Sequence, residues 1–286
     1  MVKYALHSLL WTERFDLETE FFVRKAKSLG FDGIEVYVSP QQIGDFRLEK
    51  VRRVLEDLEM ECVGSTSLTL ETDITSSDEA VRERGVHYLK ECAKLFSELG
   101  AKLVSGVIYT AWGKIVGRGR TEDEWTYAVK GLKKVCNAVK GYGVVLGVEP
   151  VNRFETYFLN TAADAIRLVK NVDENNIGVH LDTFHMNIEE KNFYEPIVMA
   201  GKMLCHFHCS ENDRGVVGTG HVNWCEVFRG LAEVDYDGWI TIESFTPELK
   251  NIATKTAIWR QLAPNADFLA SESLKFLKSM EKRYFR

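Results

Sequence analysis

The chain has 286 residues, of which 45% are apolar and 27% are charged, and its formal charge at pH 7 is −6. This composition is ordinary for a globular protein and excludes a disordered chain, which combines low hydrophobicity with high net charge. The acidic balance argues against nucleic-acid binding, and no apolar run approaches the roughly 20 residues of a membrane span. With no apolar leader and no Cys-x-x-Cys pair, the chain is predicted to be cytoplasmic, with six free thiols.

Short runs rich in β-branched residues alternate along the chain with longer amphipathic stretches. Runs of this kind are typical of buried strands. The eight predicted strands are Tyr4–His7, Gly33–Tyr37, Cys62–Ser67, Leu103–Val107, Val144–Glu149, Ile177–Asp182, Leu204–His208 and Trp239–Glu243.

The stretches between the strands carry helix start and stop signals. Ser76–Glu79 and Thr121–Glu124 have the form of capping boxes, whose side chains satisfy the free N–H groups of a first helical turn. Gly30 and Gly100 each follow a leucine, at a position where the end of a helix needs a left-handed residue.

Strand and helix alternating eight times predicts a (β/α)8 TIM barrel, for which about 250 residues is typical. The alternative is a doubly wound open sheet, which would carry a glycine-rich turn after its first strand. Here that turn, Ser8–Trp11, contains no glycine. No linker rich in Pro, Gly or Ser interrupts the chain, so residues 1–286 are predicted to form one domain.

Each of the last four predicted strands ends in a carboxylate or an imidazole. These residues are Glu149, Asp182, His208 and Glu243. In a TIM barrel the C-terminal ends of the strands meet at one mouth, where active sites lie. Three carboxylates this close repel one another unless a cation lies between them. Three oxygen ligands and one nitrogen favour a fairly hard divalent ion, with Mn²⁺ first and Mg²⁺ or Co²⁺ as alternatives.

Other polar residues near these strand ends are assigned by the alternation of side chains along a strand. His206 and His180 point inward one layer below the predicted ligands, as core histidines or donors to a ligand. Cys209 points away from the mouth and is rejected as a ligand. Glu35, near the end of the second strand, reaches the mouth and is expected to orient a polar group there.

Three segments resemble the ketose 3-epimerases, the D-tagatose and D-psicose (D-allulose) 3-epimerase group of the xylose-isomerase-like barrels. The segments are Val148–Glu155, Leu181–Glu190 and His206–Glu211. The resemblance runs from Trp11 to Arg260 and therefore covers nearly the whole chain.

The resemblance implies roles for individual residues. Glu149, Asp182, His208 and Glu243 match the metal ligands, and Glu149 and Glu243 also match the two carboxylates that move the substrate proton. The residues that match substrate-binding positions are Glu155, His185 and Arg214 at the carbonyl end of the sugar, and His7, Trp11 and Gly106 elsewhere in the pocket. The resemblance also implies a homodimer or homotetramer.

The implied reaction is epimerisation of a free ketose at C3 through an enediolate, with D-tagatose, D-allulose, D-fructose and L-ribulose as the substrate class. The chain departs from the family at Val216–Gly220 and at Ser8–Thr12, which leaves the preferred ketose open. A sugar phosphate is disfavoured by the acids of the loop Cys209–Gly215, although Gly218–Gly220 is a stretch that could hold a phosphate.

Four other functions remain as alternatives. Two of them are other enzymes of the same superfamily, namely a hydroxypyruvate-type or aldose–ketose isomerase and an inosose dehydratase. A hydrolase with three zinc ions would need more ligands than Ser67 and Val107, which end the third and fourth strands. A non-catalytic sugar-binding barrel would have no need for two carboxylates beside a metal.

Overall fold

The computed structural model describes residues 2–285, and it contains a closed barrel of eight parallel strands in sequential order. The strands are β1 (Lys3–His7), β2 (Gly33–Tyr37), β3 (Glu61–Leu68), β4 (Leu103–Ala111), β5 (Val145–Val148), β6 (Ile177–Asp182), β7 (Leu204–Cys209) and β8 (Trp239–Ile242). Pairing of β1 with β8 closes the barrel. The predicted (β/α)8 fold is confirmed, and the open sheet is excluded.

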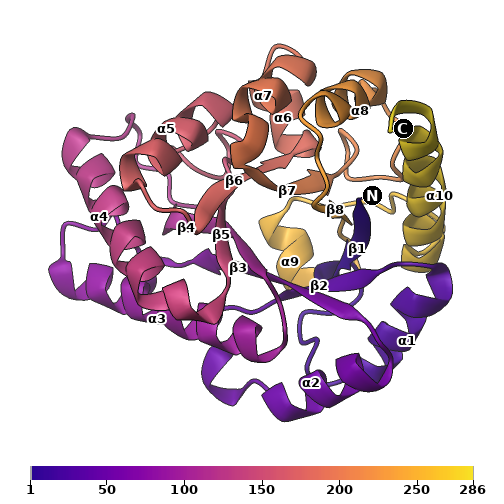
Figure 1. The fold of residues 1–286 in the computed structure, drawn as a ribbon, viewed down its shortest axis with the longest axis horizontal. Helices are drawn as coiled ribbons and strands as arrows, with labels where there is room; N and C mark the ends of the chain where they lie inside the picture. The colour runs from indigo at the N-terminus through magenta and orange to yellow at the C-terminus, as the bar shows by residue number, and fades with distance from the viewer. Residues whose placement is uncertain (1, 286) are drawn as a thin grey trace.

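Helices surround the barrel as a ring, except that α9 lies inside this ring (Figure 1). They are α1 (Thr19–Leu29), α2 (Leu48–Asp57), α3 (Glu79–Glu98), α4 (Glu122–Val139), α5 (Ala162–Val172), α6 (Thr183–Glu189), α7 (Tyr194–Ala200), α8 (Trp224–Glu233), α9 (Lys250–Lys255) and α10 (Ala266–Tyr284). The last helix, α10, reaches α1, where Lys25 Nζ lies 3.0 Å from Asp267 Oδ1. No helix in residues 2–285 is long and apolar enough to cross a membrane.

The helix ends follow the predicted signals in three of four cases. Thr121 caps α4, and the side chain of Glu124 returns a bond to the Thr121 N–H, which makes a complete capping box. Gly30 and Gly100 adopt left-handed conformations, with φ of 91° and 79°. The predicted capping box at Ser76 is wrong: Asp78 caps α3 instead, because its carboxylate lies two residues nearer the first turn and accepts from the Ala80 N–H.

The strands are buried on both faces, as expected for a parallel sheet covered by helices. All nine residues of β4 are buried. This strand runs four residues beyond its predicted end at Val107, because the pairing with β3 shifts after Ser67 and Leu68 then pairs with Ala111. The extension carries the following loop, with Trp112, over the barrel mouth.

Candidate active site

The four residues at the ends of β5 to β8 converge on one point. Glu149 and Glu243 directly follow β5 and β8, Asp182 ends β6, and His208 is the last but one residue of β7. One donor atom from each lies within 4.8 Å of the others. The Nδ1 atom of His208 lies 3.7 Å from Glu243 Oε2, 3.8 Å from Asp182 Oδ2 and 4.0 Å from Glu149 Oε1.

Strand register explains why these side chains meet. Asp182 pairs with His208, and two residues earlier His180 pairs with His206, so both pairs face the barrel interior. Cys209 has the opposite parity and packs into the hydrophobic core. Because parallel strands in register bring equivalent side chains to one level, ligands one strand apart become neighbours in space.

The cluster offers the oxygen and nitrogen donor atoms that a divalent cation requires, and one of them lacks a hydrogen-bond partner. Three carboxylates and one imidazole are nearly or fully buried, and His208 Nδ1 has no hydrogen-bond partner. A buried nitrogen without a partner is costly unless a proton or a metal ion occupies its lone pair. A site with several oxygen ligands and one imidazole binds Mn²⁺, Co²⁺ or Mg²⁺ in preference to metals that favour thiolate ligands. The residues present therefore fit a divalent ion.

Burial and the neighbouring charges shift the pKa values of Glu149 and Glu243 in opposite directions. Burial raises the pKa of Glu149 well above its usual value, and the nearby carboxylates of Glu243 and Asp182 add to this. Burial also acts on Glu243, but Arg214 and His208 outweigh it and hold the pKa of Glu243 well below its usual value. The metal-free site therefore favours a protonated Glu149 opposite an ionised Glu243.

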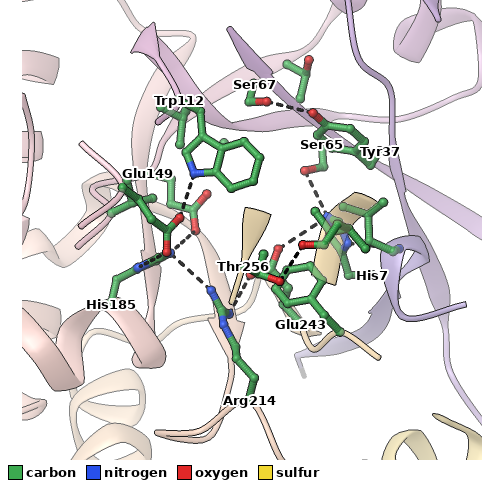
Figure 2. A pocket seen from close by; sticks show the side chains of 18 residues that line it. His7, Tyr37, Ser65, Ser67, Trp112, Glu149, His185, Arg214, Glu243 and Thr256 are labelled. Carbon is green, nitrogen blue, oxygen red and sulfur yellow. Dashed lines mark hydrogen bonds and ion pairs between the residues drawn. The ribbon is translucent and has the colours of Figure 1, made fainter. Parts of the chain in front are cut away.

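Arg214 connects the cluster to the side of the cavity formed by the loops after β5 and β6. Its Nη1 donates to Asp182 Oδ2 at 2.8 Å and to Glu243 Oε2 at 2.7 Å. The guanidinium lies over the ring of Phe184, with Cζ 4.0 Å from the ring centroid. Figure 2 shows Arg214 between His185 on one side and Glu243 on the other.

His185 and Glu155 share a network built by the loop after β5. The backbone N–H of Asn152 donates to His185 Nδ1 at 3.1 Å, so the neutral ring carries its proton on Nε2, 3.9 Å from Glu149 Oε1. Burial lowers the pKa of His185 to about 4. Glu155 accepts from the Asn152 side chain and from Trp112 Nε1, both at 2.8 Å. His185 is therefore a neutral N–H donor near neutral pH.

A cavity of about 60 Å³ lies against these residues (Figure 2). Of the ten site residues predicted from sequence, seven line it, and they are His7, Gly106, Glu149, Glu155, His185, Arg214 and Glu243. Asp182 and His208 lie beneath the lining. Trp11 lies outside it, partly buried and stacked on Phe22 with ring centroids 6.0 Å apart.

Sequence reasoning missed several lining residues, above all Tyr37, Ser65, Ser67 and Trp112. Tyr37 and Ser67 bond to each other through their hydroxyls at 2.8 Å, and Ser65 Oγ lies 3.2 Å from His7 Nε2. Tyr37 and Ser67 end predicted strands, which was the available signal, but neutral side chains at strand ends do not identify a site. Together with Leu9, Glu155 and Ile252, the side chains of Tyr37, Ser67 and Trp112 also border an outer chamber of about 720 Å³.

Comparisons with known proteins agree on the family. Residues 23–280 match the model of the xylose isomerase-like TIM barrel family. An L-ribulose 3-epimerase from Mesorhizobium japonicum is 34% identical over 281 residues, covering 97% of this chain and 93% of that protein. A D-psicose 3-epimerase from Agrobacterium fabrum is 30% identical over 93% of both chains.

Solved structures give the same result. The structure of an L-ribulose 3-epimerase superimposes with a TM-score of 0.93 at 33% identity, covering 99% of this chain and 96% of that one. A D-allulose 3-epimerase from Methylomonas sp., solved in complex with D-allulose, superimposes with a TM-score of 0.92 at 29% identity, covering 98% and 97%.

Proposed function

The chain belongs to the ketose 3-epimerases of the xylose isomerase-like TIM-barrel family, and from this premise we propose that it interconverts free ketoses that differ at C3. The proposed substrates are of the D-tagatose, D-allulose, D-fructose and L-ribulose class. The observation that carries the proposal is the pair Glu149 and Glu243, two carboxylates that directly follow strands β5 and β8 and lie 4.0 and 3.7 Å from His208 Nδ1.

The ligands for the proposed divalent ion are Glu149, Asp182, His208 and Glu243. Mn²⁺ is the first choice, with Co²⁺ and Mg²⁺ as alternatives. When bound, such an ion supplies Lewis acidity that stabilises negative charge on neighbouring sugar oxygens.

The two glutamates move the proton in the proposed reaction. One carboxylate takes the proton from C3, the electron pair of the broken C–H bond forms a C2–C3 double bond, and negative charge develops on the C2 oxygen. The other carboxyl group then gives a proton to C3 from the opposite face, and the ketone forms again. In this division one carboxyl group acts as the general base and the other as the general acid, so one must be ionised while the other is protonated.

Three further residues are proposed to hold the carbonyl end of the sugar. The neutral His185 directs an Nε2–H toward the cavity and can donate to the oxygen on which charge develops. Arg214 supplies a fixed positive charge, and Glu155 is an acceptor for a sugar hydroxyl. Burial excludes water from His185 and Arg214, which strengthens both interactions.

A free sugar is proposed over a sugar phosphate because the one stretch suited to a phosphate is already filled. Glu211 is fully buried, and its Oε2 accepts from the Gly218 N–H at 2.8 Å and from Trp224 Nε1 at 3.0 Å. A Cβ on Gly220 would lie 2.7 Å from Glu211 Oε1. A phosphate dianion there would meet a carboxylate instead of free N–H groups.

The test is proton exchange and product formation on a panel of free ketoses. Metal-loaded protein in D₂O should place deuterium at C3 of at least one of D-fructose, D-tagatose, D-allulose and L-ribulose, and form its C3 epimer. Glu149→Gln and Glu243→Gln, with metal content measured, should each lower the exchange rate by about 10²–10⁴-fold. The proposal fails if no ketose exchanges, or if a fully metallated variant exchanges at the wild-type rate.

Two controls complete the test. A higher kcat/KM for D-ribulose 5-phosphate or D-fructose 6-phosphate than for any free ketose would contradict the free-sugar assignment. We also propose a homodimer or homotetramer, and light scattering at micromolar concentration should give a multiple of the 32.6 kDa chain mass. A monomer would contradict that part alone.

A further inference from the structure

A buried carboxylate that the proposed reaction does not use lies beneath the ligand cluster. Glu35, in β2, is fully buried. Its Oε2 lies 2.7 Å from His206 Nε2, and its two oxygens lie 3.0 and 3.1 Å from His208 Nε2. One carboxylate therefore bonds two histidines of β7, which is separated from β2 around the closed barrel by β8 and β1.

These contacts fix which nitrogen of His208 faces the ligand cluster. An ionised carboxylate only accepts hydrogen bonds, so Nε2 of His208 carries the proton that points at Glu35. Nδ1 then faces the side where Glu149, Asp182 and Glu243 lie within 4.0 Å, and a bound ion would take the place of the proton on Nδ1. A carboxylate behind a ligating imidazole holds both the ring orientation and the tautomer.

His206 completes the arrangement by giving Glu35 a second donor. Its ring meets the His208 ring edge-on with centroids 4.8 Å apart, and His180 contacts both rings at 4.5 and 4.1 Å. His206 and His208 both direct Nε2 at Glu35, and the three rings pack against one another, which holds the His208 ring in place.

We propose that Glu35 and His206 are positioning residues that hold His208 with Nδ1 directed at the carboxylate cluster and thereby set the affinity for the divalent ion. The inference rests on the cation site of the proposed function, but it does not depend on which sugar is turned over. Neither residue lines the cavity.

The test is the affinity for Mn²⁺ without any sugar, measured by titration calorimetry and by the electron paramagnetic resonance signal of free Mn²⁺. Glu35→Gln replaces one accepting oxygen with a donating NH₂, so one of the two imidazoles loses its acceptor. The Kd for Mn²⁺ should rise by about 10- to 100-fold. Saturating Mn²⁺ should restore most of the kcat, because the groups that touch the substrate are unchanged.

Matched variants separate positioning from folding. Ser105→Ala, at a buried β4 hydroxyl without a hydrogen-bond partner, is the control, and its Kd should equal that of the wild type. Glu35→Asp, which keeps the charge but shortens the reach, should fall between wild type and Glu35→Gln. A folded Glu35→Gln protein with unchanged Kd would overturn the inference, as would a kcat that stays lost at saturating Mn²⁺.

A second measurement needs no variant and no bound metal. In protein labelled with ¹⁵N-histidine, His206 and His208 should both show slowly exchanging Nε2–H signals, because each donates to buried Glu35. A His208 without a proton on Nε2 would overturn the inference even if the variants fail to fold. If wild-type protein binds Mn²⁺ but turns over no ketose, the proposed function fails while the inference about Glu35 stands or falls by these readouts.

Discussion

At the scale of single residues, Arg214 competes with a cation for the same oxygens. Its Nη1 donates to Asp182 Oδ2 and Glu243 Oε2, the two atoms that also lie 3.8 and 3.7 Å from His208 Nδ1. A fixed positive charge at this point disfavours a divalent ion, even as it holds the carboxylates together. The same residue is therefore expected to weaken ion binding and to support turnover.

Arg214→Ala should separate these two effects. Removing one unit of repulsion should lower the Kd for Mn²⁺ by about tenfold, whereas loss of the substrate contact should lower kcat/KM by about 10²-fold. Calorimetry and steady-state kinetics measure the two quantities. Arg153→Ala is the control, since Arg153 pairs with Glu189 in an exposed position near the mouth. Weaker Mn²⁺ binding in Arg214→Ala would contradict the competition.

His185 should make stability depend on pH. Burial lowers its pKa to about 4, against about 6.5 in the unfolded chain. Between these values the unfolded chain binds a proton that the folded protein does not, so the free energy of unfolding falls as pH drops, by about 3 kcal/mol across the window. The full contribution of His185 to the free energy of unfolding is present above pH 6.5.

His185→Gln removes the group that takes up this proton on unfolding. In urea unfolding of metal-free protein between pH 4.5 and 7, the slope of the unfolding free energy against pH should correspond to about one proton fewer than in the wild type. His221→Gln, at an exposed position, controls for loss of an imidazole. Equal slopes for wild type and His185→Gln would show that His185 charges in the folded protein.

At the scale of elements, the first turns of α3 and α4 show how far a local pattern predicts structure. Both starts have the sequence form of a capping box. At α4 the box forms, with the Thr121 N–H 2.7 Å from Glu124 Oε2. At α3 the cap is Asp78, and Ser76 only accepts from the Asp78 N–H, because the chain enters that helix two residues later.

Alanine substitution should separate the two starts. Thr121→Ala should lower the free energy of unfolding by about 1 kcal/mol, since the start of α4 loses its cap. Ser76→Ala should change it by less than about 0.5 kcal/mol, because Ser76 is not the cap. Denaturant midpoints measure both. Equal losses would mean that the caps do not govern these helix starts.

Strand ends could be predicted from sequence, but the loops that cover them could not. β-branched runs locate each strand, and alternation within β7 correctly turns Cys209 away from His208. The bond between Trp112 and Glu155 depends on the register shift after Ser67, which no local pattern records. Glu35 bonds His206 across 171 residues of sequence, so only barrel closure reveals its partner.

At the scale of the whole molecule, the four proposed ligands come from four consecutive strands. An ion held by β5 to β8 would link half of the barrel, and an ion that binds only the folded protein adds to its stability. Without an ion the pKa values of Glu149 and Glu243 are shifted in opposite directions, upward for Glu149 and downward for Glu243.

Metal removal should therefore change activity and stability together. EDTA should abolish epimerisation and lower Tm, and Mn²⁺ or Co²⁺ should restore both. At 100 times its Kd, the ion should add about 2.7 kcal/mol to the free energy of unfolding. Calorimetry with and without EDTA measures the shift. Full activity in protein shown to be free of metal would contradict the requirement.

The lining of the cavity divides between the two halves of the barrel. The loops after β5 to β8 supply most of its charged groups, whereas β1 to β4 supply mainly a neutral wall that includes Leu9, Tyr37, Ser67 and Trp112 and continues into the outer chamber. The proposed proton-transfer groups and this neutral wall thus lie in separate stretches of sequence. Substitutions of Leu9, Tyr37, Ser67 or Trp112 can reshape the pocket while Glu149 and Glu243 stay in place, whereas Glu35, also in the first half, is tied to His208.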